Sequence, residues 1–181
     1  GLLAVSSCEA QPADKKLDLK ILAQLFYFSA GITKKHSHPG GDMYFRAGAC
    51  TGALYHIELY LVCGDLPGLD AGVYHFGAHD FALRRLRQGD YRQILVQASA
   101  DEPAVLRAQA IVVCTSTYWR NAWKYQERAY RHAYWDSGTI LSNFMAVAAA
   151  NKISAEMVLG FVDDSVNHLL GLDSGREVSL T

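Results

Sequence analysis

An aromatic and basic segment at residues 118–135 holds the side chains of this sequence best suited to chemistry. All three tryptophans of the chain lie in it, at positions 119, 123 and 135. Arg120, Lys124 and Arg128 are spaced four residues apart, so a continuous helix would place them on one face, and Arg131 would extend that face. Like charges at this spacing repel each other slightly, and a bound anion or facing acidic groups would offset that cost.

The same segment also has a purely structural interpretation. Its basic residues would then form a solvated helix face, with Glu127 paired to Arg131, over an aromatic stripe at Trp119 and Trp123 that packs into the core. Composition by itself favours this second interpretation. The choice therefore depends on what the rest of the chain places around residues 118–135.

Length and composition limit the classes of protein to consider. The chain has 181 residues, of which 50% are hydrophobic and 19% charged, which is typical of one globular domain with a substantial core. The formal net charge is −1, so the chain has no overall field that would attract nucleic acid or an anionic membrane. No apolar run reaches the length of about 20 residues that spans a bilayer. We expect neither a nucleic-acid nor a membrane partner.

The four cysteines and the first residues bear on the cellular setting. Cys8, Cys50, Cys63 and Cys114 are far apart and form no CxxC pair, so we interpret them as free thiols in a reducing cytoplasm, with a disulfide as the alternative. The chain starts without an initiator Met, which indicates a processed product or a piece of a longer protein. Residues 1–16 are expected to be a lead-in to one domain at residues 17–181.

Hydrophobic periodicity predicts a mixture of helices and strands. Strands are expected at residues 57–63, 72–76, 110–115 and 157–162, with the start of another at 177–181. Helices are expected at 17–30, within 80–100, along most of 118–150 with a restart at Asp136 or Ser137, and from the Asp163–Ser165 cap to Gly171. Residues 31–43, with Pro39-Gly40-Gly41, are expected to form a loop. Because no regular βαβ rhythm is present, the pattern predicts an α+β fold.

Four sequence blocks in register resemble one family of flavin enzymes. Residues 124–131 (KYQERAYR) resemble the KYxxRxYR motif of SagB-type flavin oxidoreductases, within the nitroreductase superfamily. Residues 46–60 (RAGACTGALYHIELY) resemble that family's RxxPSAGALYPIELY block. Two further blocks, 71–76 (AGVYHF) and 160–173 (GFVDDSVNHLLGLD), also agree in order. The resemblance covers roughly residues 17–181.

The resemblance implies a fold, a cofactor and a site. It implies a central, mostly antiparallel sheet flanked by helices, with FMN held between two such domains in a homodimer or beside a sister domain. Lys124 would be the catalytic base and Tyr125 its hydrogen-bonding partner, while the flavin accepts a hydride. The cofactor-binding residues that it implies are Arg46, Ala49, Cys50, Thr51, Gly52, Arg128 and Arg131. The substrate would be a heterocycle in a peptide-derived molecule, or a nitro or quinone compound.

The chain also departs from the family pattern. No arginine precedes Arg46, so the family's arginine-rich phosphate-binding motif has no counterpart, and the lysines at 15, 16, 34 and 35 lack the bidentate fork of arginine. The family's Pro-Ser pair is Ala49-Cys50, its later proline is His56, and its Gly-Leu-Gly turn is residues 152–154 (KIS). A non-catalytic half-domain that serves dimerisation or partner binding is therefore an alternative function.

Two other parts of the chain carry residue types that could bind an ion or a ligand. His36-Ser37-His38 has the HxH pattern of a metal site, but no third ligand lies nearby in the sequence, so we predict no metal centre there. The basic residues between 120 and 131 could also bind an anionic ligand other than FMN, which is a third functional hypothesis.

Overall fold

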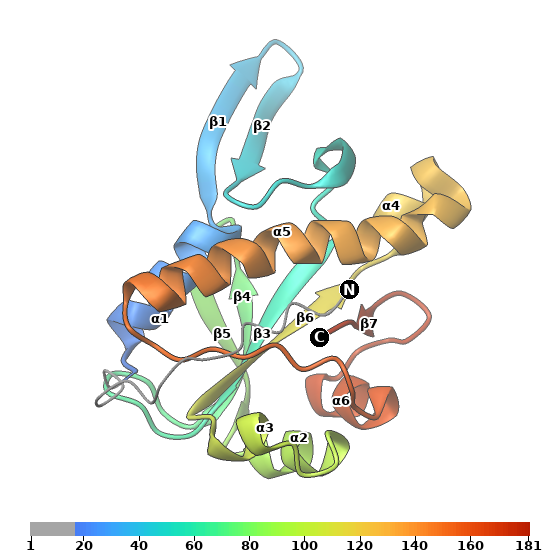
Figure 1. Cartoon of the computed structure of the whole chain (residues 1–181). Helices are drawn as coiled ribbons and strands as arrows, with labels where there is room; N and C mark the ends of the chain where they lie inside the picture. Colours follow the sequence, from blue (N-terminus) through green and yellow to red (C-terminus); the bar gives the residue numbers. More distant parts are fainter. Residues whose placement is uncertain (1–16) are drawn as a thin grey trace.

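A five-stranded antiparallel sheet forms the centre of the computed structural model, which describes residues 17–181 (Figure 1). The strand order is β5-β4-β3-β6-β7. These strands are β3 (Ile57–Cys63), β4 (Gly72–Gly77), β5 (Ala82–Gln88), β6 (Ala110–Ser116) and β7 (Val178–Ser179). The predicted α+β fold with a mostly antiparallel sheet is confirmed.

Helices cover both faces of this sheet. They are α1 (Leu19–Ala30), α2 (Arg92–Ala98), α3 (Pro103–Arg107), α4 (Trp119–Tyr125), α5 (Ala129–Ala150) and α6 (Asp163–Leu170), with short 3₁₀ turns η1 (Thr51–Ala53) and η2 (Gln126–Arg128). Helices α1 and α5 lie side by side on one face, and α2, α3 and α6 contribute to the core on the other (Figure 1).

The alternation of side chains along β3 explains this two-sided packing. Leu59 and Leu61 point into the core beneath α1 and α5, whereas Tyr60 and Val62 point into the core beneath α2 and α6. Because both faces are covered, β3 appears in the sequence as an almost continuous apolar run. That run is why residues 57–63 were correctly predicted as a strand.

Residues 32–46 form a hairpin instead of the predicted loop. Strands β1 (Ile32–His38) and β2 (Gly41–Arg46) pair antiparallel, with His38 opposite Gly41 across the two-residue turn Pro39-Gly40. The hairpin projects away from the rest of the fold (Figure 1), and the residues from Thr33 to His38 are exposed. An exposed strand has no apolar face, so the hydrophobic pattern could not reveal it.

Three other expectations also need correction. Residues 82–88 form the edge strand β5, with Arg84, Arg85 and Arg87 on it, and only 92–98 of the expected helical stretch are helical. Residues 157–162 have no ladder partner and are not a strand. The helix restarts at Ala129, seven residues before Asp136. The end at Gly171 is confirmed, because this residue adopts the left-handed conformation at φ 72° that closes α6.

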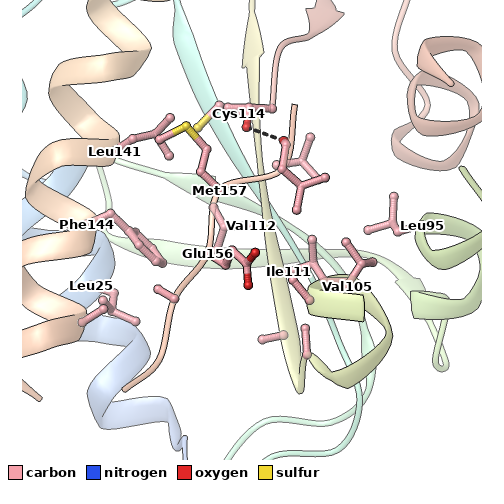
Figure 2. A pocket seen from close by; sticks show the side chains of 18 of the residues that line it. Leu25, Leu95, Val105, Ile111, Val112, Cys114, Leu141, Phe144, Glu156 and Met157 are labelled. Carbon is pink, nitrogen blue, oxygen red and sulfur yellow. Dashed lines mark hydrogen bonds between the residues drawn. The ribbon is translucent and has the colours of Figure 1, made fainter. Parts of the chain in front are cut away.

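A cavity of about 610 Å³ lies beneath the second half of α5. Figure 2 shows Leu141 and Phe144 of α5 on one side and Ile111 and Val112 of β6 near Val105 of α3. The segment from Ile153 to Phe161 borders the cavity as well, and its residues include Glu156 and Met157. The volume of the cavity falls in the range of small-molecule sites. Among residues 17–181, no helix is long and apolar enough to cross a membrane.

Candidate active site

A break in the helix at Gln126 determines where the basic residues of the 118–135 segment point. Gln126 has φ 50° and ψ −130°, which ends α4 at Tyr125 before α5 begins at Ala129. The predicted single face of Arg120, Lys124, Arg128 and Arg131 therefore does not exist, because it required one continuous helix. Arg128 and Arg131 are both exposed, and no ion pair joins either of them to another residue of the described range 17–181.

The end of α4 brings Lys124 and Tyr125 against Gly52. A Cβ added to Gly52 would lie 2.6 Å from Oη of Tyr125 and 3.3 Å from Nζ of Lys124. Nζ of Lys124 lies 5.3 Å from the centre of the Tyr125 ring. Gly52 has φ 64°, a left-handed conformation that favours glycine. Two motifs that are more than seventy residues apart in sequence therefore meet at one place.

The buried side chain of His132 packs against Tyr125 and is itself positioned by Asn121. The ring of His132 packs edge-to-face against Tyr125, with ring centres 4.6 Å apart. Nδ1 of His132 lies 2.9 Å from Oδ1 of Asn121, and both of these residues are buried. His132 and Asn121 could not be identified from the sequence, since nothing in their spacing distinguishes them from other polar residues of a helix.

Arg46 makes contacts within the chain. Its guanidinium donates to the carbonyl of Ile57 at 3.1 Å and lies 3.9 Å from the carboxylate of Glu58. Arg120 donates to the same carboxylate at 2.8 Å, and His75 lies 3.3 Å from it. Burial alone would raise the pKa of Glu58, but His75, Arg46 and Arg120 outweigh it and hold the pKa below its usual value.

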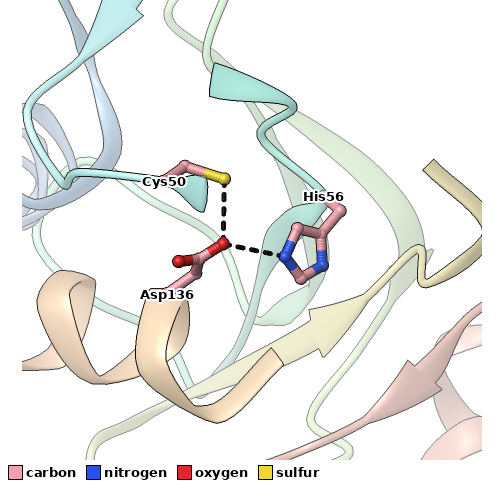
Figure 3. Close-up of side chains that lie close together, drawn as sticks. All are labelled: Cys50, His56 and Asp136. Atoms are coloured by element: carbon pink, nitrogen blue, oxygen red, sulfur yellow. Dashed lines mark hydrogen bonds and ion pairs between the residues drawn. The ribbon is translucent and has the colours of Figure 1, made fainter. Parts of the chain in front are cut away.

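Cys50 and Thr51 are fastened to helix α5 through Asp136. The carboxylate of Asp136 accepts hydrogen bonds from the Cys50 thiol at 3.1 Å, from the backbone N–H of Thr51 at 2.9 Å and from its hydroxyl at 2.8 Å. Nε2 of His56 lies 3.0 Å from Oδ2 of the same carboxylate (Figure 3). These bonds fix the loop that carries Gly52 against the middle of α5.

The pKa values in this cluster follow from burial and its hydrogen bonds. Burial raises the pKa of the Cys50 thiol to about 12, and the neighbouring Asp136 carboxylate adds to the effect. Burial would also raise the pKa of Asp136, but hydrogen bonds from His56, Cys50 and Thr51 outweigh it and hold the pKa below its ordinary value. Both shifts favour a protonated Cys50 thiol beside an ionised Asp136 carboxylate.

The aromatic residues of the segment are exposed rather than packed as a core stripe. We call this set the aromatic surface: Trp119, Trp123, Tyr130, Tyr134 and Trp135, all of them exposed. Trp123 is 70% exposed and Tyr130 is 73% exposed. The structural interpretation that packed Trp119 and Trp123 into the core is therefore wrong. Large exposed aromatic groups of this kind are typical of surfaces that bind another molecule.

Comparison with known proteins agrees with this fold. Residues 69–181 match the family model described as the nitroreductase family. The chain belongs to the nitroreductase family. Its five-stranded antiparallel sheet with helices on both faces is the fold of solved relatives, as the similarities below show.

Among solved structures, the chain is similar to an Anabaena variabilis protein described as a nitroreductase. The TM-score is 0.84 and the identity 32%, and the match covers 89% of this chain and 33% of that one. It is similar in fold to a chain of the E. coli microcin synthetase McbBCD complex, with a TM-score of 0.74, 23% identity, and 97% and 68% of the two chains covered.

Two further relatives are known by sequence. The chain is 25% identical over 179 residues to the trifolitoxin-processing protein TfxB of Rhizobium leguminosarum bv. trifolii, covering 96% of this chain and 48% of TfxB. It is 21% identical over 154 residues to MJ1384 of Methanocaldococcus jannaschii, whose name describes it as a nitroreductase. That match covers 85% of this chain and 74% of MJ1384. The chain thus spans about half the length of TfxB and a third of the Anabaena protein.

Proposed function

We propose that this chain is an FMN-dependent oxidoreductase in which Lys124 is the base and Tyr125 orients it. The observation that carries the proposal is the meeting of Lys124 and Tyr125 with Gly52, where Lys124 and Gly52 are both exposed. Family membership supports oxidoreductase chemistry. The chemistry of a flavin is the transfer of a hydride between the substrate and its own ring.

The residues around Gly52 are compatible with a flavin in three respects. Ala49 and Gly52 are exposed and small, so a planar ring can approach the backbone there. Lys124 is exposed beside them, where its Nζ is accessible to a substrate that lies against the ring. Arg128 and Arg131 are exposed cations, four and seven residues after Lys124, and would supply positive charge for a phosphate.

The roles of Lys124 and Tyr125 follow from their positions. The ammonium group lies 5.3 Å from the centre of the Tyr125 ring, and the phenol is held by His132, so the pair has a defined orientation. In the neutral form, Nζ of Lys124 would take a proton from a substrate carbon or nitrogen adjacent to the bond being oxidised. In the isolated chain Lys124 is exposed, and a second protein surface that covered it would exclude water from this step.

The site is expected to need a second domain. Residues 152–154, which the resemblance aligns with the family's cofactor-approaching turn, follow the far end of α5, and Ile153 and Ser154 border the cavity of Figure 2. A helix of 22 residues is about 33 Å long at about 1.5 Å per residue, so this turn and Lys124 cannot contact one flavin ring within a single chain. A partner that contributed its own Gly52 loop would bring the two halves together. The aromatic surface beside Lys124 is suited to such a contact.

For the substrate, we propose a heterocycle within a peptide-derived molecule. This rests on the resemblance at residues 124–131 and on similarity to TfxB, whose name assigns it to trifolitoxin processing. A nitro or quinone compound is the second substrate class, supported by the family itself.

A non-catalytic half-domain remains the alternative function. The observations in its favour are that Arg46 is occupied by Ile57 and Glu58, and that Lys152, Ile153 and Ser154 replace the small residues of a close-approach turn. It predicts a colourless protein that still associates with a second copy or a sister domain.

One set of measurements separates these functions. The purified full chain is denatured and the released small molecules are identified by mass spectrometry, alongside an absorption spectrum of the native protein. We expect FMN in the released fraction. Lys124→Ala should then abolish substrate oxidation without reducing flavin content, whereas Lys20→Ala, an exposed lysine on α1, should have no effect. Absence of flavin together with failed FMN titration would refute cofactor binding by this chain alone, and another anion in the released fraction would support the third hypothesis.

A further inference from the structure

A thiol, an imidazole and a carboxylate meet at one point of the fold, beside the Gly52 loop (Figure 3). Cys50 lies at the N-cap of η1, His56 directly precedes β3, and Asp136 lies on α5. Oδ2 of Asp136 is 3.1 Å from Sγ of Cys50 and 3.0 Å from Nε2 of His56, and the ligand atoms all lie within 4.8 Å of one another. We propose that Cys50, His56 and Asp136 bind a divalent cation of the zinc type.

The three side chains supply the ligand types that Zn²⁺ prefers. Zinc binds thiolate sulfur, imidazole nitrogen and carboxylate oxygen in tetrahedral geometry, with bonds of about 2.0–2.3 Å. Such bonds place neighbouring ligand atoms about 3.3–3.8 Å apart. The two distances to Oδ2 are only a few tenths of an ångström shorter than this range. Sγ of Cys50 and Nε2 of His56 lie within 4.8 Å of each other, and rotation of the three side chains would adjust these separations to the coordination geometry.

Neighbouring groups already orient the three ligand side chains. Nδ1 of His56 lies 2.9 Å from Oγ of Ser116, which aims Nε2 at the cluster. The hydroxyl of Thr51 donates to Oδ1 of Asp136 at 2.8 Å, and the backbone N–H of Thr51 lies 3.0 Å from Oδ1 and 2.9 Å from Oδ2. The backbone N–H of Tyr55 donates to Sγ of Cys50 at 3.1 Å. Hydrogen bonds of this kind to the outer atoms of ligands are what metal centres in proteins use to fix ligand orientation.

Binding of the cation releases one proton, from the Cys50 thiol, and changes the tautomer of His56. Without metal, Oδ2 of Asp136 accepts hydrogen bonds from the Cys50 thiol and from Nε2–H of His56. On binding, the thiol proton passes to solvent, while the His56 proton moves to Nδ1 and is donated to Ser116. Metal–sulfur, metal–nitrogen and metal–oxygen bonds replace the two hydrogen bonds, and a water molecule completes the fourth position. No electron is transferred.

Such a cation would lock the Gly52 loop to helix α5. The cluster joins residues 50–56 to Asp136, and Gly52 in turn contacts Tyr125. The site is therefore structural, and it does not depend on whether the chain binds FMN.

Cobalt binding tests this inference, because Co²⁺ substitutes for Zn²⁺ and gives visible spectra that report its ligands. The full chain is treated with a chelator, passed into chelator-free buffer and titrated with CoCl₂. We expect one equivalent to bind, with a thiolate-to-cobalt charge-transfer band in the near ultraviolet and intense visible bands of tetrahedral cobalt. Added Zn²⁺ should displace the cobalt and raise the unfolding temperature.

Single-residue variants show which side chains produce the cobalt absorption bands. Cys50→Ser should lose the charge-transfer band, and His56→Gln should reduce cobalt affinity at least tenfold with circular dichroism unchanged. Cys63→Ala, at a cysteine outside the cluster, and the double variant His36→Gln/His38→Gln, on the exposed hairpin, should both bind like the wild type. A wild-type protein with no charge-transfer band would overturn the proposal, and so would a band that persists in Cys50→Ser. If Cys50→Ser fails to fold, the wild-type and His56→Gln titrations still decide the question.

Discussion

The contact between Gly52 and Tyr125 leads to a quantitative prediction for Gly52→Ala. The new Cβ would lie 2.6 Å from Oη of Tyr125, closer than real Cβ contacts come, so the phenol or the loop must move. The left-handed backbone at φ 64° adds about 1–2 kcal/mol for a residue with a Cβ. We expect Gly52→Ala to lower the free energy of unfolding by about 1–3 kcal/mol, adding the cost of displacing one side chain.

A double-mutant cycle separates the contact from the backbone cost. Tyr125→Phe removes the oxygen that the new Cβ would meet, so Gly52→Ala should cost less in the Tyr125→Phe background, with a coupling of about 0.5–1.5 kcal/mol. Urea unfolding of the four proteins measures it. For a chain of this size, each 1 kcal/mol corresponds to a shift of about 2–4 °C in unfolding temperature.

Gly138 offers a matched control for the same substitution. It lies inside α5, and a Cβ added there would meet nothing within 4 Å. Gly138→Ala should therefore be neutral or stabilise the protein by up to about 1 kcal/mol, since glycine disfavours helix interiors. If Gly52→Ala and Gly138→Ala change stability equally, or if the cost of Gly52→Ala is the same in both backgrounds, then Tyr125 does not pack on Gly52 as described.

Three further predictions follow from the geometry of the site. Because the pKa of Glu58 is held below its usual value, its contribution to stability is present near neutral pH and is lost as the pH falls below about 4. The free energy of unfolding, measured with a chelator from pH 7 to pH 3, should therefore fall less steeply for Glu58→Gln than for the wild type. An unchanged slope would contradict this account. Because burial raises the pKa of the Cys50 thiol to about 12, the metal-free folded protein should resist alkylation of Cys50 by iodoacetamide at pH 8 and react only on unfolding, as peptide mass spectrometry can show. Trp123→Ala should change the free energy of unfolding of the isolated chain by no more than about 0.5 kcal/mol, because this side chain is 70% exposed. The same variant should weaken association with a second domain in analytical ultracentrifugation. A large loss of stability would mean that Trp123 is buried.

Parts of the fold with strong local patterns could be predicted from the sequence. The helix at residues 19–30 follows from apolar residues at helical spacing, and its start is fixed by Asp18, whose side chain accepts from the backbone N–H of Ile21 at 2.8 Å. Strand β6 follows from a continuous apolar run, because both of its faces are covered. In both elements the buried positions require apolar side chains, so the hydrophobic pattern predicts the element.

Elements at the edge of the fold could not be found in this way. Strand β5 pairs with β4 on one side only and carries charged residues such as Arg84, which is how proteins protect exposed edges. The residues from 157 to 162 show the opposite failure, since an apolar run was interpreted as a strand although no neighbouring strand pairs with it. Local propensity cannot supply a ladder partner, because that partner comes from elsewhere in the chain.

The sequence by itself determined the class of the fold and the order of its motifs. The block at residues 46–60 and the segment at 124–131 identified the family and proposed Lys124 and Tyr125, because side-chain type and spacing are local properties. Only the tertiary structure decided what these residues contact. It ended α4 at Tyr125, placed Tyr125 against Gly52, and exposed Trp119 and Trp123, which the structural interpretation had placed in the core.

The cluster of Cys50, His56 and Asp136 is the clearest case of this difference. Asp136 lies 86 residues from Cys50 and 80 from His56 along the chain, so no spacing rule joins them. They meet because α5 packs across the sheet and its buried face presents Asp136 to the loop before β3. A buried carboxylate needs hydrogen-bond donors, and the fold rather than the local sequence supplies them.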